Sequence, residues 1–142
     1  MVEDNLDDEL LTRRALSQQG LVARIVVAHD GFEALELLLG VGAGLDQLGP
    51  LPSVVLLDWK LPRMPGLEVL RQLRAAARTR LLPIVIFTSS VEARDLVDAY
   101  GNGANSYVRK PIESVEFAST LAALIRYWLR LNEPLPMPTA EW

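Results

Sequence analysis

Four short apolar runs, each rich in β-branched or aromatic residues, stand out along the chain. They cover residues 24–28, 53–57, 83–87 and 106–108, and they are too short to be helices. In the second and third runs nearly every residue is apolar, rather than every second one, which is typical of strands buried on both faces of a parallel sheet. Such a sheet needs helices on both faces, and the longer segments between the runs must supply them.

Five longer segments have apolar residues three or four positions apart, a spacing typical of helices that bury one side. The first follows cap candidates at 5–8 and ends at Gly20, the second ends at Gly40, the third follows Pro65-Gly66 and the fourth ends at Gly101. The fifth is the longest. The apolar residues expected to face the sheet are Leu10, Leu11 and Ala15; Ala34, Leu35, Leu38 and Leu39; Leu67, Leu70 and Leu73; Val91, Leu96, Val97 and Tyr100; and Phe117, Leu121, Leu124, Ile125 and Trp128.

This alternation of strands and helices predicts an α/β fold, a doubly wound parallel sheet covered by helices on both faces. Residues 40–52 contain four glycines and are expected to be a surface loop. Prolines at 134, 136 and 138 cannot continue the last helix, so we expect one domain over 1–131 and a proline-rich tail over 132–142.

Composition narrows the classes of function. Fourteen Lys and Arg against eighteen Asp and Glu give a net charge of −4, whereas a nucleic-acid partner needs a basic stripe. No apolar run approaches the ~18 residues of a membrane span, and the acidic start at Glu3 is unlike a signal peptide. The absence of Cys and the single His exclude disulfides and His-rich or thiolate metal sites. We therefore expect a cytoplasmic domain with neither nucleic-acid nor membrane partners.

Residues that can carry chemistry follow the ends of the expected strands. Glu3 and Asp4 follow a short first strand, and Asp58, Thr88 and Lys110 follow three of the apolar runs. Because the carboxyl ends of parallel strands meet at one rim, these side chains are expected to converge. Neighbouring carboxylates cannot all stay ionised without a cation between them, and carboxylate oxygens are ligands that Mg²⁺ prefers. A lysine and a hydroxyl beside that ion would bind a phosphoryl group, with a carboxylate as the nucleophile.

The sequence blocks around these residues resemble the response-regulator receiver family. The acidic pair is followed by LLDWKLPRMPG at 56–66, TSS at 88–90 and NSYVRKP at 105–111, in the family's order and spacing. Each block alone is a weak signal, but four in order at the strand ends are a strong one. The resemblance covers residues 2–131 and implies a receiver domain with the flavodoxin-like (βα)5 fold and strand order 2-1-3-4-5.

The resemblance also implies a role for each residue at the rim. Asp58 would accept the phosphoryl group, Thr88 would hydrogen-bond it, Lys110 would pair with it, and Tyr107 would be an aromatic switch that follows Thr88. Ser89 would leave room for the group, Lys60 and Ser90 would tune its hydrolysis, and Pro111 would follow a cis peptide bond. The implied ligands of Mg²⁺ are Asp4, Asp58, the backbone carbonyl of Lys60 and, largely through water, Glu3.

The implied function is that of a two-component phosphorelay protein. The phosphoryl donor would be a histidine kinase, and phosphorylation would alter the surface of the fourth helix, last strand and fifth helix. The segment 127–131 resembles single-domain regulators that partner phytochrome-type histidine kinases. That resemblance implies a homodimer through the tail and the end of the fifth helix, at Tyr127, Trp128 and Leu131.

Several signals have simpler interpretations. His29 has no second His or Cys to work with, so we expect a structural role, and Tyr107 could be only a half-buried core aromatic. The hydroxyls at 88–90 could cap the fourth helix. The arginines that recur along the third helix and its exit are expected to form a solvated face; they are Arg71, Arg74, Arg78 and Arg80.

The first strand departs from the family pattern, because only Met1 and Val2 precede the acidic pair. We expect either that residues upstream of Met1 complete the strand or that the start is misassigned, since a central strand this short leaves its neighbours' backbone groups unpaired.

Two other functions remain open. A receiver-fold dimer or scaffold that works without phosphate is favoured by the short first strand and opposed by the intact acceptor, lysine and hydroxyl. A haloacid-dehalogenase-type phosphohydrolase needs a second Asp two residues after the nucleophile, where this sequence has Lys60. Transfer of a phosphoryl group onto its own side chain and slow hydrolysis of that group would be the only chemistry of a receiver. We therefore do not expect an enzyme.

Overall fold

The computed structural model describes residues 1–20, 23–40 and 49–136. The predicted loop residues 41–48 and tail residues 137–142 lie outside the described residues. The elements in chain order are α1 (Leu6–Gln18), α2 (Gly31–Leu39), β1 (Val55–Leu57), α3 (Gly66–Ala75), β2 (Ile84–Thr88), α4 (Ala93–Gly101), β3 (Ser106–Arg109), α5 (Ser114–Arg126) and the π-helical turn η2 (Tyr127–Leu131).

The sheet is parallel, and its regular strands lie in the order β1-β2-β3. Val2 extends it beyond β1, because Val2 forms parallel bridges to both Leu57 and Ala28. Its amide donates to the Leu56 carbonyl at 2.8 Å, and the Ala28 amide donates to the Met1 carbonyl at 2.9 Å. The spatial order is therefore Ala28, Val2, β1, β2, β3, which is consistent with the 2-1-3-4-5 order of the flavodoxin-like fold.

The apolar run at 24–28 does not form the regular strand that its composition predicts. Among the described residues of this run only Ala28 takes part in a bridge. The run lacks regular pairing because the neighbouring segment around Val2 is short. Among the described residues of the run, only Val26 and Ala28 form backbone hydrogen bonds with that segment: the Met1 amino group donates to the Val26 carbonyl, and Ala28 bonds with Met1 and Glu3. β-branched residues favour extended backbone, but a strand also needs a partner along its length.

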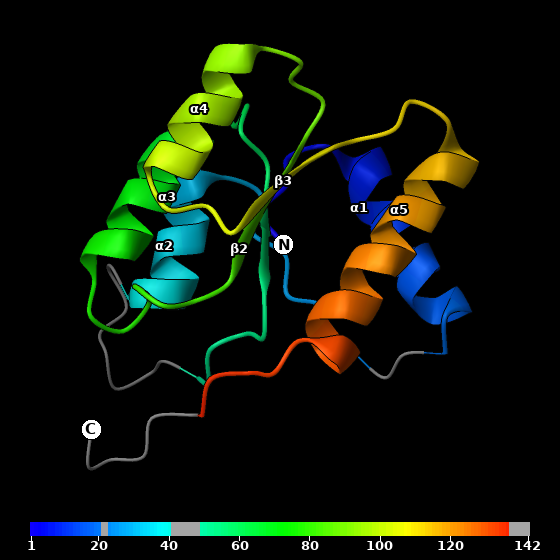
Figure 1. The fold of residues 1–142 in the computed structure, drawn as a ribbon, viewed down its shortest axis with the longest axis horizontal. Helices are drawn as coiled ribbons and strands as arrows, with labels where there is room; N and C mark the ends of the chain where they lie inside the picture. The colour runs from blue at the N-terminus through cyan, green and yellow to red at the C-terminus, as the bar shows by residue number, and fades with distance from the viewer. Residues whose placement is uncertain (21–22, 41–48, 137–142) are drawn as a thin grey trace.

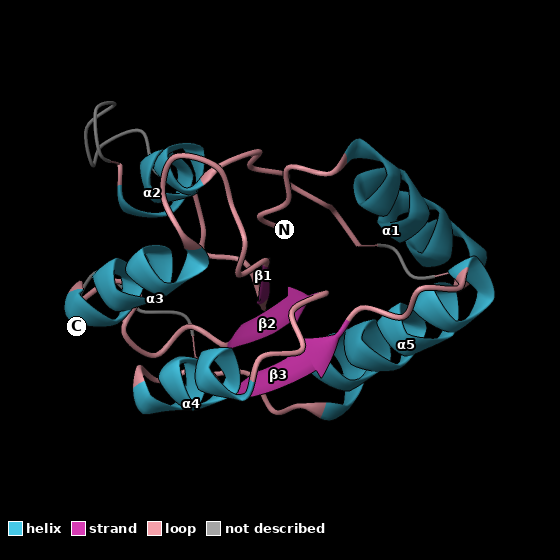
Figure 2. Ribbon diagram, turned by 90° about the horizontal axis from the view of Figure 1, so that it is seen from above, coloured by secondary structure: helices cyan, strands magenta, loops and turns pink. Residues whose placement is uncertain are grey.

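Helices cover both faces of the sheet, as expected (Figure 1). Figure 2 shows α2, α3 and α4 on one face and α1 and α5 on the other. The strand β2 serves both layers, because its alternate side chains enter different cores: Ile84 and Ile86 pack toward α2 and α3, while Val85 and Phe87 pack toward α1 and α5. On the second side the rings of Phe87 and Phe117 lie 5.3 Å apart.

Two helices depart from the expected buried stripes, α1 in part, since Ala15 is buried and Leu11 packs against the core as expected. In α1 the residues buried are Glu9, Thr12, Ala15 and Leu16, and Leu10 is exposed. In α4 Ala99 and Asp95 are buried, whereas Val97 is 69% exposed and Tyr100 is also on the surface. The small Ala99 side chain faces the sheet instead, so the larger apolar residues of α4 point outward. Val91, also expected in this stripe, precedes the helix and is exposed.

None of the helices in the described part of the chain combines the length and the hydropathy needed to cross a membrane.

Candidate functional site

Three carboxylates gather at the rim formed by the ends of Val2 and β1. The side chains of Glu3, Asp4 and Asp58 each offer an oxygen, and these oxygens lie within 4.8 Å of one another. The bridge between Val2 and Leu57 explains the proximity, because it sets the residues after both strands side by side. Glu3 and Asp58 are buried, and Asp4 is exposed. The expected convergence of the acidic residues is thus present in the structure.

Lys110 completes this cluster from the end of β3. Its Nζ donates to Asp58 Oδ2 at 3.0 Å, to Asp8 Oδ2 at 2.9 Å and to Glu3 Oε2, and its side chain is only 6% exposed. The position of Lys110 follows from the sheet, since its amide donates to the Thr88 carbonyl at 2.8 Å. One ammonium group therefore faces three carboxylates.

The electrostatics of the cluster favour a further cation. Burial raises the pKa of Glu3 to about 7, although hydrogen bonds from Lys110 and the Asn5 amide act in the opposite direction. Burial also disfavours the charged form of Lys110, but its hydrogen bonds to Glu3 and Asp8 and the charge of Asp58 raise its pKa overall. Lys110 stays protonated and the carboxylates outnumber it. An all-oxygen donor set with excess negative charge fits a hard divalent ion such as Mg²⁺.

Thr88 and Tyr107 meet at the loop that follows β2. Thr88 is fully buried, and its Oγ1 accepts a hydrogen bond from the Ser90 amide at 3.3 Å. Tyr107 is half-buried, and its hydroxyl donates to the Ser90 carbonyl at 3.3 Å. Burial is the main cause that raises the pKa of Tyr107. The two residues expected to act as a switch are therefore joined through Ser90.

A buried carboxylate on α4, Asp95, was not singled out by the sequence. Its Oδ2 lies 3.3 Å from Lys60 Nζ and accepts a hydrogen bond from Ser90 Oγ. Burial acts to raise the pKa of Asp95, but hydrogen bonds from Ser90, Lys60 and Trp59 hold it below its usual range. The amide of Lys60 in turn donates to Asp58 Oδ1 at 3.3 Å. Asp95 thus connects the two residues expected to tune phosphoryl hydrolysis.

Asp8 is the other site residue that sequence reasoning missed. It was noted only as a cap candidate, and Asn5 is the residue whose side chain caps α1. Asp8 lies in the first turn of α1, which begins directly after the acidic pair and so directs this carboxylate back to the rim. A helix that starts two residues after a site residue is the signal that could have identified it.

Two further sequence predictions, both near the site or the exit of α3, are wrong. The bond before Pro111 is not cis, because the described residues contain no cis peptide bond; prolyl bonds favour the trans form by about 0.5–1 kcal/mol. Arg74 does not belong to a solvated face. Its guanidinium donates to the carbonyls of Leu82 and Gly103 at 2.8 and 2.9 Å, because it reaches across the exit of α3. His29 contacts Glu9 at 3.2 Å through Nε2, a contact compatible with the expected structural role.

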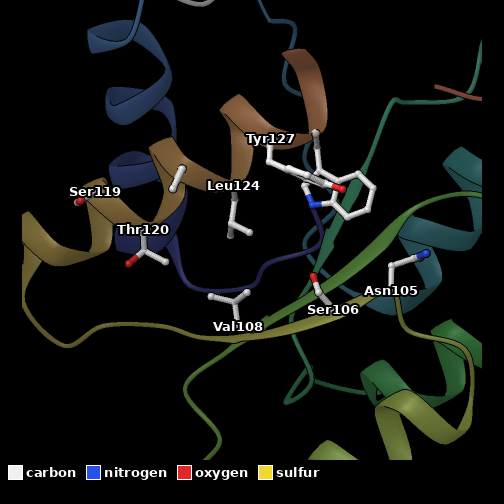
Figure 3. Close-up of a pocket in the computed structure, with 9 residues that line it drawn as sticks. Asn105, Ser106, Val108, Ser119, Thr120, Leu124 and Tyr127 are labelled. Carbon is white, nitrogen blue, oxygen red and sulfur yellow. The ribbon is translucent and has the colours of Figure 1, made fainter. Parts of the chain in front are cut away.

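An open groove of about 780 Å³ lies apart from the acidic cluster, between β3 and α5 (Figure 3). Val108 and Ser106 form its strand side, and Leu124 and Tyr127 lie across from them. The rings of Tyr127 and Trp128 stack edge to face with centroids 5.0 Å apart. Tyr127 is 48% exposed and Leu131 67% exposed, so η2, which continues α5, presents apolar surface beside this groove.

The chain matches the model of the response regulator receiver domain over residues 1–122, and it belongs to that family. Receiver domains of two-component response regulators accept a phosphoryl group, bind a divalent metal ion and partner with histidine kinases. The acidic cluster, the strand-end lysine and the flavodoxin-like sheet described above are consistent with membership.

Individual relatives narrow the comparison. The chain is 39% identical over 133 residues to the probable methanogenesis regulatory protein FilR2 of Methanothrix harundinacea, covering 93% of this chain and 83% of that protein. It spans 47% of the length of the phosphate regulon transcriptional regulatory protein PhoB of Rhizobium meliloti, at 35% identity.

Solved structures of phytochrome response regulators are similar to this chain over most of their length. The phosphorylated cyanobacterial phytochrome response regulator RcpA is similar with a TM-score of 0.88 at 26% identity, and 95% of each chain is covered. The bacteriophytochrome response regulator AtBRR is similar with a TM-score of 0.68 at 43% identity, and 86% of this chain and 89% of that chain are covered.

Proposed function

We propose that this chain is a single-domain response regulator that accepts a phosphoryl group from a histidine kinase on Asp58. One observation carries the proposal. The buried Asp58 carboxylate lies 3.0 Å from Lys110 Nζ, and it offers an oxygen within 4.8 Å of oxygens of Glu3 and Asp4. A nucleophile, a hard-metal donor set and an anion-binding cation thus meet at one rim.

The transfer follows from the placement of these groups. An Asp58 carboxylate oxygen forms the bond to phosphorus while the P–N bond of the donor phosphohistidine breaks, and the electron pair leaves with the imidazole nitrogen. Glu3, Asp4, Asp58 and the backbone carbonyl of Lys60 would hold Mg²⁺, which neutralises charge on the phosphoryl oxygens. Lys110 pairs with the phosphoryl group, and Thr88 donates a hydrogen bond to it.

The product of phosphorylation is a changed surface, so we propose that the chain is not an enzyme acting on other molecules. As Thr88 turns to the phosphoryl group, the loop that it shares with Ser90 and Tyr107 must shift. The surface that would change is formed by α4, β3 and α5. This surface already exposes large apolar side chains, which suits protein recognition; they are Val97, Tyr100, Ile112 and Val115.

The partner we propose is a phytochrome-type histidine kinase. The assembly we propose is a homodimer through the tail and η2, the continuation of the fifth helix, at Tyr127, Trp128 and Leu131. The similarity to phytochrome response regulators and the exposed Tyr127 and Leu131 support this choice. We also propose that the protein is cytoplasmic and has neither nucleic-acid nor membrane partners, because it would bind a histidine kinase there.

Intact mass spectrometry tests the proposal after incubation with a small acyl-phosphate donor and Mg²⁺. Wild type should gain one phosphoryl group, whereas Asp58→Asn and wild type with chelated metal should gain none. Circular dichroism should show that Asp58→Asn is folded, because the substitution is nearly isosteric. A folded wild type without the mass increment would refute phosphoryl acceptance and favour the scaffold that works without phosphate.

A further inference from the structure

Ser90 uses all of its polar groups to join the residues of the switch. Its amide donates to Thr88 Oγ1 at 3.3 Å, its carbonyl accepts from the Tyr107 hydroxyl at 3.3 Å, and its own hydroxyl donates to Asp95 Oδ2. Any displacement of Ser90 therefore changes its contacts with two strands and with α4. Of these contacts, the one with Asp95 is the only one made to a charged side chain.

Asp95 continues the connection to the acceptor. The same carboxylate oxygen lies 3.3 Å from Lys60 Nζ, and the Lys60 amide donates to Asp58 Oδ1 at 3.3 Å. Asp95 is buried in the first turn of α4, so its position is fixed by the packing of that helix. The contacts form one path: Asp58, Lys60, Asp95, Ser90, and then Thr88 and Tyr107.

The present arrangement has to change when the site is filled. No hydrogen bond joins Thr88 to Asp58 in the part of the chain that the structure describes, and the Thr88 hydroxyl instead faces the Ser90 amide. For Thr88 to reach a phosphoryl oxygen on Asp58, the loop 88–90 must move. The contact between Ser90 and Asp95 resists this movement, because it holds the loop to α4.

We propose that Asp95 is a positioning residue that holds the loop 88–90 in its unphosphorylated arrangement and couples occupancy of the Asp58 site to α4. The inference rests on the proposed function, because it concerns the response to a phosphoryl group at Asp58. A ligand that favours the moved loop must overcome the contacts of Asp95, and removal of those contacts shifts the equilibrium toward the moved loop. Loss of Asp95 should therefore tighten binding of a phosphoryl mimic.

The test uses beryllofluoride with Mg²⁺ as the phosphoryl mimic and the full chain as protein. Binding is followed by the change in tryptophan fluorescence, to which Trp59, next to the acceptor, contributes together with Trp128 and Trp142. Loop mobility is followed by amide hydrogen exchange over residues 89–96. Asp95→Ala should bind beryllofluoride about fivefold more tightly than wild type, a size common for coupled sites. Without ligand, its amides at 89–96 should exchange faster than those of wild type. Its affinity for Mg²⁺ alone should be unchanged.

Asp98→Ala is the matched control, because Asp98 lies one turn further along α4 and its carboxylate contacts, among the described residues, only Arg94, at 3.8 Å. It should behave as wild type in both measurements. Ser90→Ala removes the hydroxyl and keeps the backbone contacts, so it should reproduce the effect of Asp95→Ala. The double variant should bind no more tightly than Asp95→Ala alone, because Asp95→Ala already removes the contact with the Ser90 hydroxyl. Ser90→Ala also keeps the test valid if Asp95→Ala fails to fold.

The possible failures are distinguishable. A wild type that binds no beryllofluoride in the presence of Mg²⁺ contradicts the proposed function itself. A wild type that binds, together with folded Asp95→Ala and Ser90→Ala variants of unchanged or weaker affinity, overturns the role of Asp95 alone.

Discussion

Lys110 Nζ and Asp58 Oδ2 lie 3.0 Å apart, although 52 positions separate the two residues in the chain. The same ammonium contacts Glu3 and Asp8, which reach the rim from the segment after Val2 and from α1. Lys110 is therefore the group that holds three negatively charged segments together, in addition to its proposed role toward the phosphoryl group.

Replacement of Lys110 by Ala should lower the free energy of unfolding by about 3 kcal/mol without divalent metal, because it leaves buried carboxylates without a counter-charge. Mg²⁺ should restore part of this loss, since it neutralises the same carboxylates. Urea denaturation with and without Mg²⁺ measures both effects. Arg94→Ala removes an exposed cation on α4 and should change stability by less than about 1 kcal/mol. A Lys110→Ala variant as stable as wild type without metal would contradict this structural role.

Arg74 connects the exit of α3 to two other segments. Besides the Leu82 and Gly103 carbonyls, it donates to Asn105 Oδ1 at 2.9 Å, and this oxygen also accepts from the Ile84 amide at 2.8 Å. Arg74→Lys keeps the charge but loses the planar, multiply donating group. We expect a loss of about 2 kcal/mol in unfolding free energy.

Arg71→Lys is the control for this experiment, because in the described part of the chain Arg71 donates only from Nε to Asn102 Oδ1, at 3.2 Å, on the surface. Its free energy of unfolding, measured by urea denaturation, should lie within about 0.5 kcal/mol of that of wild type. Equal losses of unfolding free energy in the two variants would show that the contacts of Arg74 stabilise the fold no more than those of a surface arginine.

The strand-end part of the site was predictable, and its helical part was not. Asp58 and Thr88 directly follow an apolar run and Lys110 comes two residues after one, so the topology of a parallel sheet places them at one rim. Asp8 and Asp95 lie on helices, and their approach to the rim depends on how α1 and α4 rotate and pack. Periodicity did not fix that rotation, as the exposed Leu10 and Val97 show. Composition alone also could not reveal that the run at 24–28 lacks a partner over most of its length.

Gly66 stands where α3 begins beside the acceptor. A Cβ at this position would lie 2.4 Å from the Asp58 carbonyl oxygen and 2.8 Å from Trp59 Cα, both backbone atoms that cannot yield without moving the end of β1. Gly66→Ala should therefore destabilise the fold by about 1–3 kcal/mol and slow phosphorylation of Asp58.

Thermal unfolding and the rate of the mass increment measure the two effects of Gly66→Ala. Gly101→Ala is the control, because a Cβ there meets nothing within 4 Å at the end of α4. It should be neutral or stabilising by about 0.5 kcal/mol, as expected for Ala in a helix. If Gly66→Ala matched this control, the close approach of α3 to the acceptor would have no energetic consequence.

The proposed dimer interface can be tested by substitutions in η2, which follows α5. Tyr127 and Leu131 lie on its exposed side, whereas Trp128 is half-buried and packs against the core formed with Phe117 and Leu121. Replacing both Tyr127 and Leu131 by Ser should weaken dimerisation by about 2 kcal/mol, or about 30-fold in the dissociation constant, with little effect on the monomer fold.

Sedimentation velocity over a range of micromolar concentrations measures this shift. Leu81→Ser removes a comparably exposed leucine from the connection between α3 and β2 and should leave the profile unchanged. Trp128→Ala should also lower the melting temperature, because its ring contributes to the core, so a loss of dimer in that variant alone would be ambiguous. A double Ser variant that sediments as wild type would exclude Tyr127 and Leu131 as interface residues. The apolar side chains on α4 would then be the next surface to test.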